Sequence, residues 1–172
     1  VSHTDRVSKF YLSKEQKSVF AFEESPAFML GAYDILSGNI HNIDNVREAF
    51  KTGKGVNYSD SHPCIFSGTA RFFRPSYSAN LLEKWIPAIP SVEKKLQDGC
   101  NFADIGCGFG VSSLMIANAF QNSKIYGFDI HRPSIENANK EAKQMKINNA
   151  IFKVSDAENY DGEFDIITFF DC

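Results

Sequence analysis

Two patterns of hydrophobic and polar residues divide the chain near residue 100. Up to that point, apolar residues recur every three or four positions and are bounded by capping residues, which is typical of helices. From residue 101 onward, short apolar runs alternate with helical patterns, which is typical of strands joined by helices. The sequence therefore predicts a helical N-terminal region followed by an α/β unit.

Capping residues locate the first helices. Ser13 and Gln16 have the spacing of a capping box, so a helix is expected to follow Ser13. Ser25 and Pro26 predict the N-cap and first turn of a second helix, and a third is expected to end at Gly53. Ahead of them, the aromatic segment 8–13 predicts a short strand.

The segment before the α/β unit has a less regular pattern. Residues 57–77 mix turn-forming and aromatic residues without a clear period, and they predict an ordered connection. Two short helices are then expected, over residues 77–86 and over residues 90–99 with a stop at Gly99.

The α/β unit is predicted to contain strands at residues 101–105, 124–129, 150–155 and 164–170, and helices at residues 111–120 and 133–145. This alternation favours parallel strands with right-handed crossovers and helices on both faces. The predicted fold class is therefore α/β, a Rossmann-like doubly wound parallel sheet that is incomplete at about four strands. Such sheets bind ligands at the carboxyl ends of their strands.

Composition narrows the classes of partner. The chain has 172 residues, 43% of them hydrophobic, and a net charge of −3, without a basic block that would favour nucleic acid. No apolar run approaches the roughly 20 residues of a membrane span, so we expect a cytoplasmic protein without membrane contact. The cysteines, Cys64, Cys100, Cys107 and Cys172, include no CxxC pair, which argues against a disulfide framework and a zinc site.

The segment "ADIGCGFG" joins the first predicted strand to the helix that follows it. Its glycines, Gly106, Gly108 and Gly110, allow the backbone to approach a ligand, and the helix N-terminus offers unpaired N–H groups. A dinucleotide fingerprint G-x-G-x-x-G would need a third glycine at position 111, where the chain has Val111. The spacing therefore disfavours a pyrophosphate.

Three aspartates follow or end the first three strands. Asp104 precedes the glycines, where its charge opposes a pyrophosphate but attracts an ammonium group. Asp129 ends the second strand and can accept hydrogen bonds from both ribose hydroxyls. Asp156, beside the small Ala157, can accept a hydrogen bond from the exocyclic amine of adenine. Together they predict one elongated ligand site.

The motifs "ADIGCGFG", "GFDI" and "SDAENY" resemble the first three cofactor motifs of class I S-adenosylmethionine-dependent methyltransferases. The resemblance implies that Asp104 and the loop glycines hold the methionine part, that Asp129 holds the ribose and that Asp156 reads the adenine. The cofactor-binding residues expected from it are Asp104, Gly106, Cys107, Gly108, Gly110, Asp129, Ile130, Asp156, Ala157 and Phe170.

The terminal "FDIITFFDC" and the segment "FSGTARFFRPSYSANLLEKWIPAIPSVEKKL" are similar to a subgroup with an N-terminal winged-helix domain. This resemblance implies a winged-helix or dimerisation remnant in residues 1–60, connecting helices over the cofactor in 61–100, and the first half of the cofactor domain in 101–172. The segment 8–13 would be the last strand of the wing. We expect a small-molecule methyl acceptor, a homodimer through the N-terminal helices, and a fragment of a longer protein, because the family needs about seven strands.

Further site residues are predicted around the cofactor. Phe72, Phe73 and Tyr77 are expected to roof it, and Arg71 or Arg74 to meet its carboxylate. Asp171, at the end of the fourth strand, is a hypothetical catalytic base, and no metal is expected.

Two alternatives to an active methyltransferase stay open. The chain can be a fragment or degenerate copy that binds the cofactor or a partner without catalysis. A nicotinamide dehydrogenase is disfavoured by Asp104 and by the position of Gly110.

Overall fold

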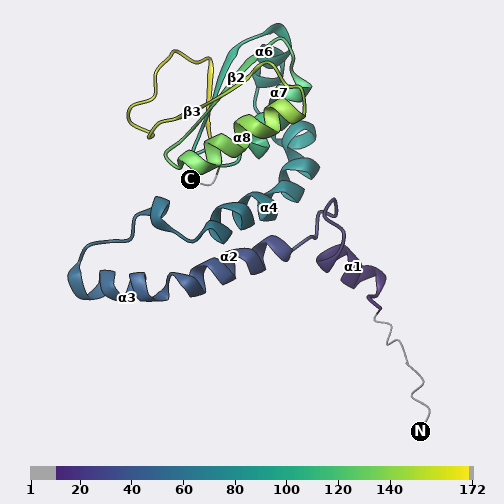
Figure 1. Cartoon of the computed structure of the whole chain (residues 1–172). Coiled ribbons are helices and arrows are strands. Elements are labelled where there is room, and N and C mark those ends of the chain that lie inside the picture. The colour runs from purple at the N-terminus through teal and green to yellow at the C-terminus, as the bar shows by residue number, and fades with distance from the viewer. Residues whose placement is uncertain (1–10, 171–172) are drawn as a thin grey trace.

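The computed structural model describes residues 11–170 (Figure 1). The N-terminal part contains α1 (Lys14–Phe20), α2 (Leu30–His41), α3 (Ile43–Thr52), the 3-10 turn η1 (Tyr58–Asp60) and α4 (Pro63–Asn80). A π-helical turn η2 (Leu81–Trp85), α5 (Ile86–Ala88) and α6 (Val92–Asp98) lead into the α/β unit. That unit contains β1 (Asn101–Ile105), α7 (Val111–Ala119), β2 (Lys124–Asp129), α8 (Arg132–Gln144), β3 (Ala150–Val154) and β4 (Ile166–Phe169).

The strands form one parallel sheet in the order β3-β2-β1-β4. In its centre, Phe102 of β1 is in register with Ile125 of β2 and with Ile166 of β4. The connections through α7 and α8 return each strand to the same direction, as a parallel sheet requires. The predicted Rossmann-like parallel sheet of four strands is confirmed.

Helices cover one face of this sheet. Phe102, Ile125 and Phe152 point to that face and form one core with buried residues of η2, α6, α7 and α8. Ile135, Ala138 and Ala142 of α8 belong to this core, whereas Met145, which follows at the same helical spacing, is half exposed. Burying each large apolar side chain contributes about 1.5–3 kcal/mol, so this core fixes the two crossover helices on the sheet.

Aromatic side chains cover the other face. Ala103, Ile105 and Phe128 pack there against Tyr160 and Phe164, which come from the segment between β3 and β4. That segment is irregular, so within residues 11–170 a loop takes the place of the helix that strand–helix alternation predicts on this face.

The predicted helix starts were right for α1 and wrong for α2. Ser13 and Gln16 form the complete capping box at the start of α1. Ser25 instead begins a turn, because its carbonyl accepts a hydrogen bond from Phe28 N and its hydroxyl accepts one from Ala27 N, and α2 begins only at Leu30. Ser25 and Pro26 therefore form a turn ahead of α2 and do not begin the helix itself.

The prediction of an ordered connection over residues 57–77 was wrong for most of its length. The chain forms the 18-residue helix α4, which begins at Pro63 and continues through Pro75. One face of α4 packs on α2. There, a Cβ on Gly31 of α2 would lie 2.7 Å from the carbonyl oxygen of Gly68 of α4. This close contact between two helix backbones stabilises α4 despite the internal proline.

The predicted strand over residues 8–13 falls mostly outside the described residues. Its described part forms no strand, and Ser13 is the N-cap of α1. Within residues 11–170, no helix is long and apolar enough to cross a membrane.

Candidate cofactor site

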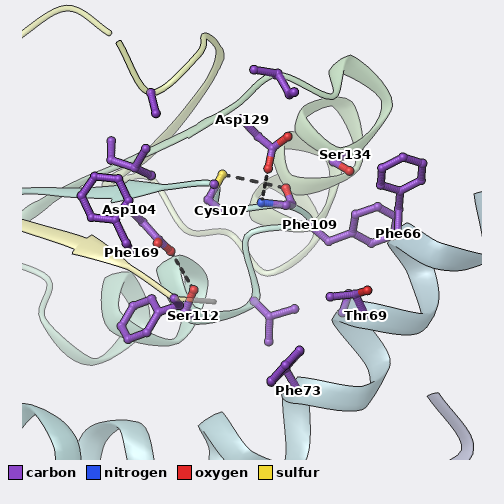
Figure 2. A pocket seen from close by; sticks show the side chains of 18 of the residues that line it. Phe66, Thr69, Phe73, Asp104, Cys107, Phe109, Ser112, Asp129, Ser134 and Phe169 are labelled. Carbon is purple, nitrogen blue, oxygen red and sulfur yellow. Dashed lines mark hydrogen bonds between the residues drawn. The ribbon is translucent and has the colours of Figure 1, made fainter. Parts of the chain in front are cut away.

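A cavity of about 490 Å³ lies where the carboxyl ends of the strands meet α4. Figure 2 shows it between the loop after β1 and the side chains of α4. Its lining residues are Tyr58, Phe66, Thr69, Ala70, Phe73, Tyr77, Asp104, Ile105, Gly106, Cys107, Gly108, Phe109, Val111, Ser112, Asp129, Ile130, Ser134, Ser155, Ala157, Phe169 and Phe170. This is the place at which an open α/β sheet is expected to bind a ligand.

The glycine loop is anchored to the neighbouring strand. The backbone N–H groups of Gly106 and Cys107 both donate to the Phe128 carbonyl, over 2.8 and 3.0 Å. Gly106, Gly108 and Gly110 all have positive φ, a conformation that other residues adopt only with strain. The loop therefore needs its glycines for backbone geometry whether or not a ligand is bound.

The second and third glycines of the loop have different surroundings. A Cβ on Gly110 would lie 2.6 Å from Phe152 Cε1 and 3.1 Å from the Cβ of Ala138, so this position is closed by the packing of α8 and β3. A Cβ on Gly108 would meet nothing within 4 Å. Gly108 thus borders open space at the cavity, whereas Gly110 lets the helix and sheet pack closely.

Asp104 is completely buried at the base of the cavity. Its Oδ2 atom accepts hydrogen bonds from the hydroxyls of Ser112 and Ser113, over 2.7 and 2.6 Å, while its Oδ1 has only a long contact of 3.5 Å with Thr168 Oγ1. Burial, and to a lesser degree the charge of Asp129, raises the pKa of Asp104 to about 6, although the serine hydroxyls oppose the shift. One carboxylate oxygen is thus held by α7 and the other has free acceptor capacity.

This burial predicts a pH dependence of stability. Because the pKa of Asp104 is higher in the folded state, at about 6, than its ordinary value of 3.8, the folded state binds more protons between these values. The contribution of Asp104 to the free energy of unfolding should therefore decrease by about 2 kcal/mol as the pH rises from 4 to 7. Urea titrations at each pH measure it, and the difference between wild type and Asp104→Asn isolates the Asp104 contribution. A difference that does not change with pH would contradict the prediction.

Asp129 holds the loop through its carboxylate. Its Oδ2 accepts from Gly108 N and its Oδ1 from His131 N, both over 2.8 Å. Each oxygen keeps a further lone pair for a ligand hydroxyl. Tyr58 also lines the cavity, and partial burial together with the charge of Asp129 raises the pKa of its phenol. Asp129 therefore lines the cavity with acceptor capacity left over, and its role toward a ribose stays a prediction.

Asp156 is occupied by its own loop. Its carboxylate accepts hydrogen bonds from the backbone N–H groups of Glu158 and Asn159 and from the Asn159 side chain. The Asn159 side chain is the largest cause that lowers the pKa of Asp156. The side chain is exposed and lies outside the cavity lining, whereas its neighbours Ser155 and Ala157 are part of that lining. Its role toward adenine stays a prediction.

One face of α4 forms the outer wall. Phe66, Thr69, Ala70, Phe73 and Tyr77 line the cavity at helical spacing, and Figure 2 shows three of them projecting from α4 toward the loop. Of these residues the sequence predicts only Phe73 and Tyr77 at the ligand, because the pattern of residues 57–77 predicts a connection and not a helix. The 3.6-residue spacing of these positions was the signal that could have found the others.

Ring stacking ties this wall to the sheet. The rings of Phe66 and His131 are stacked, with centroids 3.6 Å apart, and Tyr58 meets Phe66 edge-on at 5.2 Å. At the other end of the wall, Tyr77 meets Phe170 edge-on at 5.7 Å. Aromatic contacts therefore join both ends of α4 to residues that follow β2 and β4.

Three residues predicted near the ligand lie elsewhere. Phe72 and Arg74 do not line the cavity, and Arg74 is exposed. Arg71 points to the opposite side of α4, where it pairs with Glu23 over 2.6 Å and with Asp34 over 3.1 Å. The prediction that Arg71 or Arg74 meets the ligand was therefore wrong. Arg71 is bound by the acids Glu23 and Asp34, and Arg74 is exposed to solvent.

The Arg71 contacts predict a structural role. Its guanidinium also lies 5.1 Å from the ring centroid of the buried Phe28, so it joins α4 to the turn before α2. Arg71→Ala should lower the free energy of unfolding by about 1 kcal/mol, since both acids are partly exposed and solvent weakens the pairs. Arg47→Ala, in an exposed pair on α3, is the matched control and should change it by less than about 0.5 kcal/mol in the same urea titration. Equal losses in the two variants would contradict this role.

The charge of the lining restricts its ligand. Asp104 and Asp129 are its ionisable acids, and among the described lining residues there is no lysine, arginine or histidine. Phosphate groups are normally met by such cations or by a helix N-terminus without acids beside it. The arrangement instead suits a ligand with a positive charge and several hydroxyl groups.

The other predicted site residues are Cys107, Ile130, Phe170 and Asp171. Cys107, Ile130 and Phe170 all line the cavity, and Cys107 is buried; their contact with a cofactor stays a prediction. Asp171, the hypothetical base, lies outside the described residues. Among residues 11–170, no group of three His, Cys, Asp or Glu side chains is placed to hold a metal ion.

Comparison with known proteins gives matches to the α/β unit. Residues 96–172 match a family described as "Methyltransferase domain". The probable cobalt-precorrin-6B C(15)-methyltransferase (decarboxylating) of Methanosarcina acetivorans is 34% identical over 77 residues, which cover 45% of this chain and 42% of that protein. The corresponding protein of Methanosarcina mazei is 32% identical over the same coverage. The chain thus spans less than half the length of the curated relatives it matches.

Solved structures show partial similarity to the chain. Coclaurine N-methyltransferase is 22% identical, with a TM-score of 0.42, over 46% of this chain and 24% of that chain. PKMT2 from Rickettsia typhi, solved in complex with AdoHcy, is 34% identical, with a TM-score of 0.39, over 43% and 15% of the two chains. The segment of residues 96–172, which carries the glycine loop, is thus similar in sequence to a methyltransferase domain.

Proposed function

We propose that the cavity binds S-adenosylmethionine and that the whole protein transfers its methyl group to a small-molecule acceptor. The observation that carries the proposal is the lining itself, in which Asp104 and Asp129 flank a glycine loop without any basic residue among the described lining residues. Such a lining attracts a ligand with ammonium and sulfonium charges and repels one with a pyrophosphate. The match of residues 96–172 to a methyltransferase domain supports it.

The chain's own residues can hold the cofactor in three places. The Oδ1 atom of Asp104, which has only a long contact with Thr168, can accept from the ammonium group. The carboxylate of Asp129 can accept from the ribose hydroxyls beside the two backbone N–H groups that it already binds. Ala157, with the loop around it, borders the end expected to receive the adenine.

Methyl transfer needs alignment and the exclusion of water more than acid or base groups. When bound, S-adenosylmethionine supplies a methyl group on a positively charged sulfur. The aromatic side chains Phe73, Tyr77, Phe169 and Phe170 surround the part of the cavity nearest the end of β4 and would keep water from it. Their apolar rings also suit a small organic acceptor better than a strongly anionic one.

Calorimetric titration tests this function with three outcomes. We expect S-adenosylhomocysteine to bind with a micromolar dissociation constant and NAD to show no binding under the same conditions. Binding of NAD alone would assign the cavity to a dinucleotide and overturn the proposal. Binding of neither ligand to a folded chain, checked by circular dichroism, would favour a copy that lacks catalytic function.

A further inference from the structure

A row of exposed apolar side chains runs along α2 and α3. We call this set the α2–α3 stripe, and it consists of Met29, Tyr33, Leu36, Ile40, Ile43, Val46 and Phe50. Successive members of the stripe are three or four residues apart, as on one face of a helix. All seven are large hydrophobic residues, yet the exposed fractions of their side chains range from 41% for Met29 to 88% for Phe50. Single exposed apolar residues are ordinary, but a continuous row marks an interaction surface.

The stripe is continuous because α2 and α3 form nearly one rod (Figure 1). Asn42, between the two helices, keeps a helical conformation with φ −87° and ψ −2°. Its N–H donates to the Gly38 carbonyl, and its own carbonyl accepts from Val46 N. The helical hydrogen-bond pattern therefore passes through the junction without a break in the face.

The opposite face of α2 packs against α4. Gly31 and Gly38 are buried against α4, where their absent side chains allow close contact with Gly68 and Ile65. The stripe consequently faces away from the rest of the described chain. Among the described residues, Tyr33 of the stripe meets the ring of Phe20, with the two ring centroids 6.5 Å apart.

We propose that the α2–α3 stripe binds the same stripe of a second copy of this chain, in antiparallel orientation. The spacing of the stripe is nearly the same when read in either direction, which a two-fold symmetric interface requires. Around an axis between Asn39 and Ile40, the register places Met29 opposite Phe50, Tyr33 opposite Val46, and Leu36 opposite Ile43. The two copies of Ile40 then lie beside the axis.

The polar residues are compatible with this register. It places Asp34 opposite Asn45, Asp44 opposite Ile35, and Arg47 opposite Ala32, so that no like charges face each other. The seven side chains, about half exposed, offer on the order of 600 Å² per chain, close to the ~800 Å² that each partner buries in a standard interface. A second copy thus satisfies both the length and the chemistry of the stripe.

The first experiment measures the mass of the whole chain in solution. Light scattering after size exclusion at tens of micromolar should give twice the chain mass of 19.3 kDa. Leu36→Glu, which places a charge in the centre of the stripe, should give the monomer mass. Ile89→Glu is the matched control, because Ile89 is equally exposed at 55% but lies outside the stripe, and it should leave the dimer intact. A monomeric wild type, or a Leu36→Glu variant that stays dimeric, overturns the proposal.

The second experiment measures the register by disulfide trapping. Ile40→Cys should form a covalent dimer under mild oxidation, because its two copies lie beside the axis. Phe50→Cys should not, because the two copies of residue 50 are about 30 Å apart in this register. Wild type gives the baseline for the natural cysteines. Rapid cross-linking of Phe50→Cys as well would indicate a parallel pair and overturn the antiparallel orientation.

Discussion

Asp129→Ala should weaken the binding of S-adenosylhomocysteine by roughly 100-fold to 1,000-fold. The carboxylate of Asp129 is the acceptor that we assign to the ribose hydroxyls, and hydrogen bonds to a charged group each contribute about 1.5–3 kcal/mol. The same substitution frees the N–H of Gly108, whose hydrogen bond to Asp129 is 2.8 Å long. Loss of the ligand contacts and loosening of the loop therefore act in the same direction.

Calorimetry measures this effect, and two further variants separate its causes. Asp129→Asn keeps one acceptor oxygen and should lose about tenfold in affinity, less than the alanine variant. Asp98→Ala removes an acid in an exposed pair with Lys94 on α6 and should bind as wild type does. If Asp129→Ala binds within threefold of wild type, the ribose does not contact Asp129 and the orientation of the ligand must be revised.

Gly110→Ala should lower the free energy of unfolding by about 4 kcal/mol. The new methyl group would lie 2.6 Å from Phe152 Cε1 and 2.8 Å from Phe152 Cζ. The ring cannot move toward β2, because a Cβ on Gly127 would already lie 2.4 Å from Phe152 Cδ1. The strain of an alanine at the φ of +72° adds to this steric cost.

Gly108→Ala is the matched control in the same loop. Its φ is also positive, at +53°, but no atom lies within 4 Å of the new methyl group. The variant should lose only about 1 kcal/mol of unfolding free energy, and urea titration of both variants measures the difference. Equal losses at the two positions would show that backbone strain, rather than packing against Phe152, determines the cost at Gly110.

The α/β unit could be predicted well because its signals are local. Each strand is a short apolar run, and the bounds of β1 and β2 agree with the prediction to the residue. The glycine loop and Asp104 were identified by spacing alone, and both line the cavity. Parallel strand ends meet at one edge of the sheet, so a linear list of strand ends was sufficient to locate the site.

The wall formed by α4 could not be predicted from local signals. Its sequence contains Pro63 and Pro75 and a mixture of aromatic and small residues, which resembles a turn-rich connection. The helix is stabilised by contacts with α2, where Gly31 and Gly68 allow the two backbones to meet. These residues are far apart in the sequence, so tertiary packing decides the conformation of α4.

The hydrogen bonds and ion pairs of individual side chains could not be predicted from the sequence either. Asp156 has a suitable position in the sequence, yet its own loop supplies the donors for its carboxylate. Arg71 follows the cavity residue Ala70 directly but points to the other side of the helix, toward Glu23 and Asp34. The side of a helix that a residue faces depends on the helix phase, which the prediction of a connection did not supply.

The contact between Gly31 and Gly68 has a consequence for how the molecule responds to a ligand. Because two helix backbones touch there without intervening side chains, no compressible layer separates α2 from the wall of the cavity. A ligand that stops the movement of α4 must also restrict α2. Amide hydrogen exchange should therefore slow along α2 when the cavity is filled, although none of the residues of α2 lines it.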